Sequence, residues 1–299
     1  MARTLVTIVT PVFNQGDFVS RTIQSVLDQS YDNIEYIIVD DGSTDDTASI
    51  LERYRSKAII IRQENCGQSA ALNLGWSMAQ GHVLAYLSAD DIMYTDCVAN
   101  IVNAFEDDVS VVYPDYDLID AHGDIIRVNE CEEFSRERLF CDLVCIPGAG
   151  AFFTKDAYLA VGGWDTSLQH VPDFEFWLRM VSQGRFKRLP EPLAGFRVHS
   201  GSGSVKPISA QRSDEIIHIV EKYKKIIEEV GPLKKPEAAA RLMAARSHLQ
   251  SGRYITGFKR YSCAISIVGL TALGLDNLRF VFSGAIRRQL YRLKLVFKC

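Results

Sequence analysis

The sequence has no hydrophobic run long enough to cross a membrane. Its longest nearly uncharged stretch, residues 261–275, is shorter than the roughly 20 apolar residues that a membrane-spanning helix needs. The opening residues, MARTLVTIVTPVF, lack the layout of a secretory signal peptide. The cysteines number seven and do not have the spacing of metal ligands, which is typical of free thiols in a reducing compartment. These absences predict a cytoplasmic protein.

An excess of positive charge is also missing. The 299 residues include 33 Lys and Arg against 37 Asp and Glu, a formal net charge of -4. Because no overall basic field exists to attract phosphate backbones, nucleic acid is not expected as a partner. The hydrophobic fraction of 47% and the charged fraction of 23% are those of an ordinary globular protein.

Residues 287–298, RRQLYRLKLVFK, are the exception to this charge balance. Basic and apolar residues are interleaved there without any acid. Two interpretations stay open: an amphipathic helix in peripheral contact with anionic lipid at the cytoplasmic face of a membrane, or a helix packed on the rest of the protein with a solvated basic face.

Apolar, β-branched runs alternate with helix-like segments through the first ninety residues. The runs have the length and composition of buried strands and lie at residues 5–10, 34–39, 58–61 and 83–87. Segments with helical spacing or a capping residue lie between them, at residues 18–27, 44–54 and 67–79. This succession predicts an α/β fold with a parallel sheet and right-handed crossovers.

After residue 91 the alternation weakens. Further helices are expected at 97–106, 156–161 and 174–181, and further strands at 111–119 and 148–154. From residue 213 onward the pattern is helical, and residues 237–268 read as a helical hairpin around Gly252. The chain is therefore divided into an α/β domain over 1–205, with halves 1–110 and 111–205, and a helical extension over 206–299.

Two pairs of adjacent carboxylates follow predicted strands of one sheet. Asp40 and Asp41 end the second strand, and Asp90 and Asp91 follow the fourth. Ligands of open parallel sheets bind at the carboxyl ends of the strands, so both pairs are expected at one crevice. Adjacent carboxylates repel unless a cation lies between them, and a hard dication held with phosphate oxygens meets that need. For each pair alone, a solvated turn or a helix N-cap is the alternative.

Four motifs around these residues, in order, resemble the nucleotide-binding half of family 2 inverting glycosyltransferases of the GT-A fold. They are TPVFNQGDFVSRTIQSVLDQSY, VDDGSTDDT, NCGQSAALNLG and LSADD. The resemblance implies a mixed, mainly parallel sheet flanked by helices. It also implies an enzyme of hexosyl or N-acetylhexosaminyl type that uses a nucleotide-sugar donor, with a UDP-sugar favoured.

The resemblance implies that the donor nucleotide contacts residues from all four motifs. Asp41 would accept a hydrogen bond from the imide N–H of uracil. The other expected donor-binding residues of these motifs are Pro11, Phe13, Asn14, Asn65, Gly67 and Asp90. For the rest of the third motif, plain helix packing of its small residues is an equal alternative.

Asp90 and Asp91 match the DXD-type motif of the family, which contacts the ribose and a Mg²⁺ or Mn²⁺ ion that bridges the diphosphate. A dication stabilises the negative charge that develops on the leaving nucleoside diphosphate. The chain departs from the family pattern at Ser88, where the first acid is expected, and at Leu72, where an arginine is common. A serine hydroxyl is a weak metal ligand, so the metal is expected on Asp91, with Asp90 second.

The stretch GGWDTSLQHVPDFEFWLRM resembles the family's segment that carries the catalytic base. Asp173 occupies the base position, and Pro172 stands where another acid is usual. Inversion needs a carboxylate that takes the proton of the acceptor hydroxyl as it attacks the anomeric carbon. A helix N-cap is the structural alternative for Asp173. Glu175 is the reserve candidate, and Trp164 and Asp165 are expected to shape the acceptor pocket.

The segment GFRVHSGSGS resembles the family's R-x-H region, which precedes a flexible loop. Arg197 is expected to neutralise phosphate charge, and His199 to touch the diphosphate or the metal. A structural role is the alternative for the histidine. The Gly/Ser run would suit a loop that closes over the donor sugar and excludes water.

These expectations describe an inverting, metal-dependent enzyme whose acceptor is a hydroxyl of a glycan or lipid-linked glycan, as in polysaccharide synthesis. A catalytically inactive sugar-nucleotide-binding or scaffold protein is one alternative, which the substitutions at residues 88 and 172 keep open. A sugar nucleotidyltransferase is a second alternative, disfavoured because no Gly-rich loop with a basic residue follows the first strand. The sugar, the linkage and the oligomeric state are not predicted.

Overall fold

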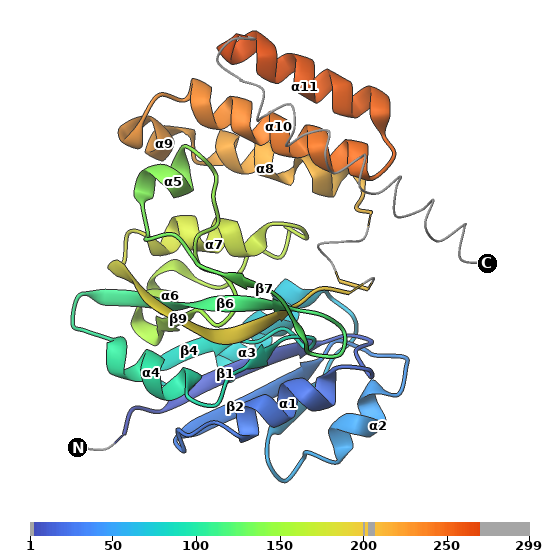
Figure 1. The fold of residues 1–299 in the computed structure, drawn as a ribbon, viewed down its shortest axis with the longest axis vertical. Helices are drawn as coiled ribbons and strands as arrows, with labels where there is room; N and C mark the ends of the chain where they lie inside the picture. Colours follow the sequence, from blue (N-terminus) through green and yellow to red (C-terminus); the bar gives the residue numbers. More distant parts are fainter. Residues whose placement is uncertain (1–2, 200, 203–206, 270–299) are drawn as a thin grey trace. The chain divides into compact units, whose positions relative to one another are not determined.

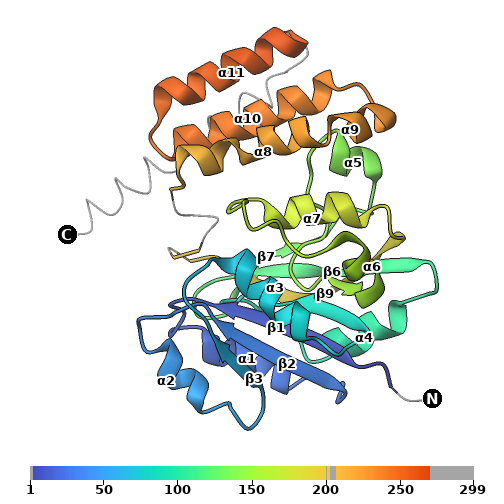
Figure 2. The same ribbon diagram turned by 180° about the vertical axis from the view of Figure 1, so that it is seen from behind.

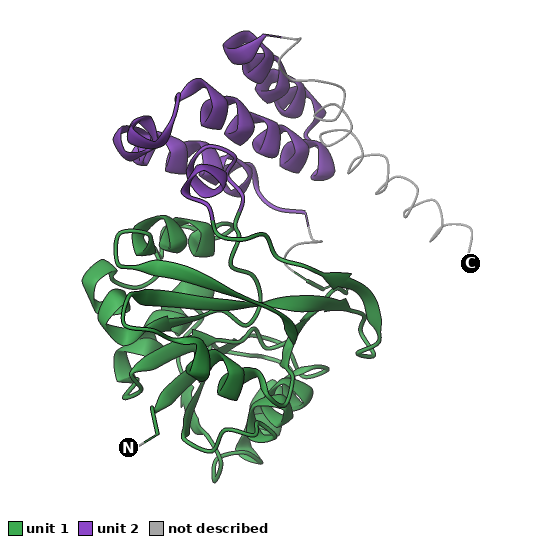
Figure 3. Cartoon of the chain, turned by 60° about the vertical axis from the view of Figure 1, so that its left-hand side comes forward, with its two compact units in different colours: residues 1–134, 145–205 green, residues 135–144, 206–299 purple. Residues whose placement is uncertain are grey.

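A mixed β-sheet organises the first of two units in the chain (Figure 1). The computed structural model describes residues 3–199, 201–202 and 207–269, and the sheet has nine strands within these ranges. Residues 1–134 and 145–205 form the first unit, and residues 135–144 and 206–299 form the second (Figure 3).

The N-terminal runs build a parallel half of this sheet. Its strands are, in spatial order, β3 (Ile59–Arg62), β2 (Ile34–Asp40), β1 (Val6–Val12) and β4 (Val83–Tyr86). All seven residues of β1 are buried, as expected for a β-branched strand covered on both faces. The predicted strand–helix series is confirmed.

Three helices connect these strands and cover the two faces of the parallel half. The helices α1 (Val19–Leu27) and α2 (Thr47–Glu52) lie on one face, and α3 (Gln68–Met78) lies on the other (Figures 1 and 2). The chain runs from β1 outward to β3 and then returns to add β4 on the opposite side of β1. At such a switch point the two neighbouring connections leave in opposite directions, which opens a crevice at the carboxyl ends of the strands.

The second half of the sheet is mixed and begins at β8 (Phe152–Thr154), which pairs antiparallel with β4. Its longest strands, β6 (Val109–Ile119) and β9 (Arg185–Arg197), pair in parallel with each other. The remaining elements of this half are β5 (Ile92–Met93), α4 (Cys97–Ala104), β7 (Ile125–Asn129), α6 (Lys155–Val161) and α7 (Pro172–Met180).

The strand β9 was not predicted, because Pro190 and Pro192 interrupt its apolar pattern. Its pairing with β6 changes register between Pro114 and Tyr116, opposite these prolines, so the ladder accommodates residues without a backbone N–H. The predicted strand at 148–154 is real only over β8, since residues before Phe152 form a loop.

The described part of the second unit consists of helices, which agrees with the helical pattern of the sequence from residue 213 onward. It contains α8 (Ala210–Lys222), α9 (Lys224–Val230), α10 (Lys234–Gln250), α11 (Tyr254–Val268) and the short α5 (Arg136–Phe140). The helices α10 and α11 form the predicted hairpin, with Gly252 at φ 81° in the turn. The segment that carries α5 is supplied from within the first half of the chain, which the sequence did not indicate.

Among the described residues, no helix has the length and hydropathy needed to span a membrane. The basic stretch 287–298 lies outside the described residues.

Candidate active site

The carboxyl ends of β1, β2 and β4 lie at one edge of the sheet, and the acidic pairs follow them. Val12 of β1 stands opposite Asp40 of β2, and Val9 stands opposite Tyr86 of β4. The backbone N–H of Asp41 donates to the carbonyl of Val12 at 2.8 Å. The structure therefore brings three of the four motifs to the same edge, as the strand pattern predicted.

Asp41 holds the third motif against this edge. Its carboxylate is 3% exposed and accepts hydrogen bonds from the Gln63 side chain at 2.7 Å and from the backbone N–H groups of Cys66 and Gly67 at 2.8 Å each. Gly67 has φ 90° and is the N-cap residue of α3. These contacts fix the loop before α3, and Asn65 is exposed on it.

The loop after β1 is tied to the loop after β2. Asn14 adopts φ 52°, and its side-chain oxygen accepts from the backbone N–H of Thr44 at 2.8 Å. Gly42 has φ 77°, and a Cβ there would lie only 3.0 Å from the backbone nitrogen of Asn65. Pro11 is buried within β1, whereas Phe13 is 43% exposed at its end. An exposed aromatic ring beside a rigid polar loop is suited to stacking on a nucleobase.

Asp91 and Arg197 anchor the turn that carries the second acidic pair. Asp91 is 4% exposed, and its carboxylate accepts the backbone N–H of Arg197 at 2.7 Å. The Arg197 guanidinium is 1% exposed and donates to the carbonyls of Asp90 at 2.6 Å and Asp120 at 2.7 Å. Burial, with a contribution from the Asp90 charge, raises the pKa of Asp91 well above its ordinary value.

Asp90 and His199 face each other across this turn. The Asp90 carboxylate lies 3.1 Å from Nε2 of His199, with side-chain exposures of 17% and 10%. The other ring nitrogen of His199 lies 3.2 Å from the backbone N–H of Gly201, and the ring packs on Phe18 at 4.4 Å between centroids. The structure thus joins the predicted DXD-type motif to the predicted R-x-H segment.

The donor set in this region fits one mode of metal binding. Across the described residues, no three His, Cys, Asp or Glu side chains gather as a closed metal site. Mg²⁺ bound to nucleotide phosphates is commonly held by only one or two protein ligands. A pair such as Asp90 and His199 therefore fits a dication shared with a diphosphate and does not fit a metal held by the protein alone.

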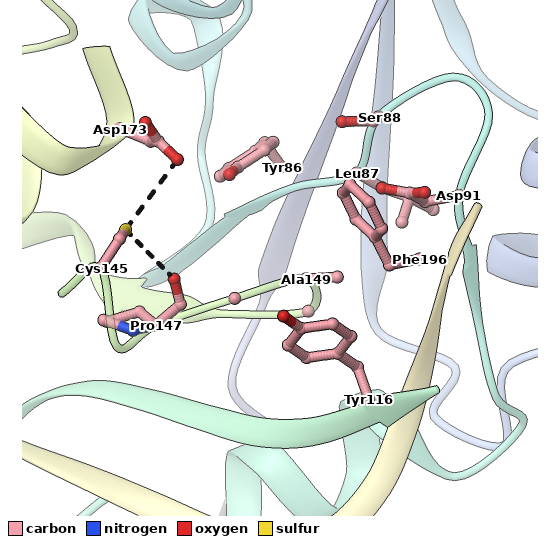
Figure 4. A pocket seen from close by; sticks show the side chains of 12 residues that line it. Tyr86, Leu87, Ser88, Asp91, Tyr116, Cys145, Pro147, Ala149, Asp173 and Phe196 are labelled. Carbon is pink, nitrogen blue, oxygen red and sulfur yellow. Dashed lines mark hydrogen bonds between the residues drawn. The ribbon is translucent and has the colours of Figure 1, made fainter. Parts of the chain in front are cut away.

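A cavity of about 220 Å³ lies beside Asp91 and reaches Asp173 (Figure 4). Asp173 and Cys145 line one end, and Ser88 and Asp91 line the other. The full lining consists of Tyr86, Leu87, Ser88, Asp91, Tyr116, Cys145, Pro147, Gly148, Ala149, Gly150, Asp173 and Phe196. Every one of these residues belongs to the first unit.

Asp173 lies in the first turn of α7, directly after Pro172. The N-cap position is Val171, so Asp173 does not cap the helix, although its carboxylate accepts the N–H of Phe174 at 2.8 Å. The Sγ of Cys145 lies 4.0 Å from the other carboxylate oxygen. The cavity walls reduce solvation of this carboxylate and raise the pKa of Asp173, against smaller effects of its backbone hydrogen bonds and of His170.

The predicted acceptor residues lie around α7 and do not belong to the lining of this cavity. Trp164 is 4% exposed, and its backbone exchanges two hydrogen bonds of 2.8 Å with the Asn73 side chain. The Asp165 carboxylate accepts hydrogen bonds from the backbone N–H and the hydroxyl of Ser167. Glu175 is 1% exposed and pairs with Arg179 at 2.8 Å.

Sequence reasoning missed the residues that close the cavity. Tyr116 comes from β6, Phe196 from β9, and Cys145 and residues 147–150 from an irregular loop. A Cβ on Gly148 would lie 2.3 Å from the Tyr116 ring, so this loop passes closer to the ring than any other residue would allow. These contacts depend on pairing between strands that are far apart in the sequence, so no local sequence pattern predicts them.

The model of the glycosyl transferase family 2 matches residues 7–159, about half of the chain. An uncharacterised glycosyltransferase of Rickettsia typhi is 30% identical over 228 residues, which cover 73% of this chain and 69% of that protein. Chondroitin synthase of Escherichia coli is 28% identical over 216 residues, which cover 70% of this chain and 31% of that longer protein.

Two solved structures show the same fold. Residues 1–349 of S. aureus TarS, in complex with UDP-GlcNAc, superpose with a TM-score of 0.63 at 14% identity and cover 97% of this chain and 92% of that one. The mannosyltransferase PcManGT of Pyrobaculum calidifontis, in complex with GDP-Man and Mn²⁺, gives a TM-score of 0.58 at 19% identity and covers 97% and 88%. At these identities the likeness concerns the fold, which is the predicted GT-A type.

Proposed function

The chain belongs to glycosyl transferase family 2, and we propose that it is an inverting, metal-dependent glycosyltransferase that uses a UDP-sugar. The acceptor is a hydroxyl of a glycan or a lipid-linked glycan. One observation carries the proposal: a single cavity has the nucleotide-side residues Ser88 and Asp91 at one end and the carboxylate of Asp173 at the other.

The nucleotide lies, in this proposal, along the edge formed by the ends of β1 and β2. Phe13 and Asn14 contact the base and ribose, with Pro11 behind them, and Asn65 and Gly67 border the base. Each oxygen of a carboxylate has room for two hydrogen bonds, and the Asp41 oxygen that accepts from Gly67 keeps one acceptor site for the imide N–H of uracil. The TarS complex with UDP-GlcNAc supports UDP as the carrier.

A Mn²⁺ or Mg²⁺ ion is held by Asp90 and His199 rather than mainly by Asp91. One Asp91 oxygen is already bound to the backbone of Arg197, whereas Asp90 and His199 face each other at 3.1 Å. When bound, the dication supplies positive charge to the diphosphate as the leaving group departs. The Mn²⁺ in the PcManGT complex supports this proposal.

Arg197 enters the proposal as a residue that positions the acidic turn. Its guanidinium is buried and donates hydrogen bonds to the backbone carbonyls of Asp90 and Asp120, so it fixes the backbone that carries the Asp90 side chain. Its positive charge still lies close to the diphosphate, where it favours an anionic ligand.

Asp173 is the general base. It takes the proton of the acceptor hydroxyl while that oxygen forms a bond to the anomeric carbon from one side. The bond from the anomeric carbon to the diphosphate oxygen breaks on the other side, so UDP leaves and the configuration inverts. The raised pKa of Asp173 makes its carboxylate a better proton acceptor.

The acceptor contacts of Trp164, Asp165 and Glu175 are indirect in this proposal. The Glu175–Arg179 pair holds the loop 161–163, since Arg179 also donates to the carbonyls of Val161 and Gly163. That loop leads into Trp164 and Asp165 and so sets the shape of the acceptor side. We also propose a cytoplasmic enzyme whose basic residues 287–298 contact the membrane when the acceptor is lipid-linked.

Isothermal titration of the purified protein with UDP and Mn²⁺ tests the nucleotide site, and incubation with UDP-sugars and candidate acceptors tests transfer. We expect metal-dependent UDP binding and release of UDP from a donor. A folded protein that binds no UDP in the presence of Mn²⁺ contradicts the proposal. Release of pyrophosphate from a nucleoside triphosphate and a sugar phosphate would instead indicate a nucleotidyltransferase.

A further inference from the structure

One side chain of the third motif, Asn73, makes its contacts away from the nucleotide. It is half-buried on α3. Its side-chain oxygen accepts the backbone N–H of Trp164 at 2.8 Å, and its amide nitrogen donates to the backbone carbonyl of Trp164, also at 2.8 Å. An amide carries an acceptor oxygen and a donor nitrogen side by side, so Asn73 satisfies both backbone groups of one residue.

The chain on the other side of this contact has a glycine where only a glycine fits. A Cβ on Gly163 would lie 2.1 Å from the side-chain oxygen of Asn73 and 2.7 Å from its Cγ. The backbone before Trp164 therefore approaches the amide more closely than any residue with a Cβ allows. Both partners, the amide on α3 and the glycine opposite it, are matched to this contact.

The same stretch of chain is also bound to α7, the helix that carries Asp173. Arg179 of α7 donates to the backbone carbonyls of Val161 at 2.6 Å and Gly163 at 2.7 Å. Residues 161–164 are thus held by Arg179 from α7 and by the amide from α3. They form a hydrogen-bonded bridge between a helix of the nucleotide-binding motifs and the helix of the proposed base.

An aromatic contact joins the same two helices directly. Trp76, one turn after Asn73 on α3, stacks on Phe176 of α7, with 6.0 Å between the ring centroids and 18° between the ring planes. Both rings are buried. Burial of apolar rings has no preferred direction, whereas a hydrogen bond weakens steeply when its angle changes. The rings therefore keep the helices together, and the hydrogen-bonded bridge defines how they are oriented.

We propose that Asn73 is a positioning residue that sets the direction of the Asp173 carboxylate through residues 161–164 and α7. The inference rests on the proposed function, because it takes Asp173 as the base. The other end of α3 starts at Gly67, whose N–H is bound by Asp41, so one helix connects the nucleotide side to the base side. A misplacement of about 1 Å can lower a rate on the order of a hundredfold, so a side chain remote from the substrate can control turnover.

Asn73→Ala and Asn73→Asp test this role. The first removes both hydrogen bonds, and the second keeps the shape but places a carboxylate oxygen against the carbonyl of Trp164. We expect kcat to fall by about 10–100-fold in each variant, with UDP affinity in the presence of Mn²⁺ nearly unchanged. Asn103→Ala, which removes an exposed amide on α4, is the matched control and should change neither quantity.

The double variant Asn73→Ala/Asp173→Asn separates positioning from a general loss of structure. If the amide acts through Asp173, its removal costs nothing further once the base is absent, so the double variant should have the kcat of Asp173→Asn. A purely structural role would lower kcat by the same factor with and without the base. The Asn73→Asp variant serves in the same comparison if the alanine variant does not fold.

Three results overturn the inference and leave the proposed function standing. They are an unchanged kcat in either Asn73 variant, an equal loss of kcat with and without Asp173, and failure of both Asn73 variants to fold, which would assign the amide to stability alone. Failure of the unaltered protein to bind UDP or to transfer a sugar overturns both the inference and the proposed function.

Discussion

At the residue scale, Asp173 is the side chain on which the proposed chemistry depends most. Replacing it by Asn keeps an oxygen that accepts the N–H of Phe174 but removes the proton acceptor. We expect kcat to fall by about 10²–10⁴-fold, the range usual for loss of a general base, with UDP affinity nearly unchanged. Steady-state kinetics with titration of UDP measure both. Retained turnover would remove Asp173 as the base.

The same substitution has a predicted effect on stability. Because folding raises the pKa of Asp173, the charged carboxylate is disfavoured in the folded protein above that pKa. Asp173→Asn should therefore leave the melting temperature at pH 7 unchanged or slightly higher. A variant that keeps its melting temperature but loses turnover has therefore lost the catalytic base and not the folded structure.

The raised pKa of Asp173 also predicts the acid side of the activity profile. The base is active only when ionised, so kcat/KM should fall as the pH drops through the raised pKa of Asp173. The midpoint of that fall should lie above the value near 3.9 of an unperturbed aspartate. A pH–rate profile with UDP release as the signal measures it, and a midpoint at or below the ordinary value would contradict the assignment.

Asp90 and His199 provide a test of the metal assignment. Asp90→Ala and His199→Ala should each weaken Mn²⁺-dependent UDP binding by about tenfold or more, because each removes one protein ligand from a site that has few. UDP binding without metal should change little. His218→Ala, which alters an exposed histidine on α8, is the matched control. If only Asp91 substitutions affect the metal dependence, Asp91 is the principal ligand.

At the element scale, a buried polar network joins α8, α10 and α11. His248 is fully buried, its Nε2 lies 3.1 Å from Asp214, and its Nδ1 accepts from Arg253 at 2.8 Å. Arg260 completes the network with two hydrogen bonds to Asp214. Nδ1 of His248 accepts a hydrogen bond from Arg253, so protonation of Nδ1 would place an N–H group of His248 against the N–H group of Arg253.

This network predicts how the helical unit responds to acid. Burial, with the Arg253 and Arg260 charges, lowers the pKa of His248 against the raising effect of Asp214. The folded state therefore binds fewer protons than the unfolded state, and its stability falls as the pH drops below about 6.5. Chemical denaturation at pH 7.5 and 5.5 should show this loss, and His248→Gln should reduce it. An equal loss in His248→Gln would show that other groups are responsible.

At the scale of the whole molecule, the parallel half of the sheet was the most predictable part. β1, β2 and β4 are signalled locally by β-branched runs that end at Pro11, Asp40 and the acidic turn. Sheet topology then places their ends at one edge, so the acidic pairs could be expected together from the sequence alone.

Two features could not be predicted in this way: the residues that form the walls of the cavity, and the membership of residues 135–144 in the second unit. Tyr116 lies at the cavity because β6 pairs with β9, and β9 was not predicted because its prolines interrupt the apolar pattern of a strand. Residues 135–144 join the helical unit through contacts such as the Asp142–Lys235 pair at 2.8 Å. Both features depend on contacts between residues about 75 to 95 positions apart, which no local period reveals.

The stereochemistry of the product shows whether the sugar is transferred by a direct displacement that Asp173 assists. The protein is incubated with an α-linked UDP-sugar, Mn²⁺ and an accepted glycan, and NMR of the product gives the configuration of the new bond while released UDP is quantified. Direct displacement assisted by Asp173 predicts one UDP per bond formed and a β-linked product. An α-linked product, or sugar transfer without release of UDP, would contradict the account.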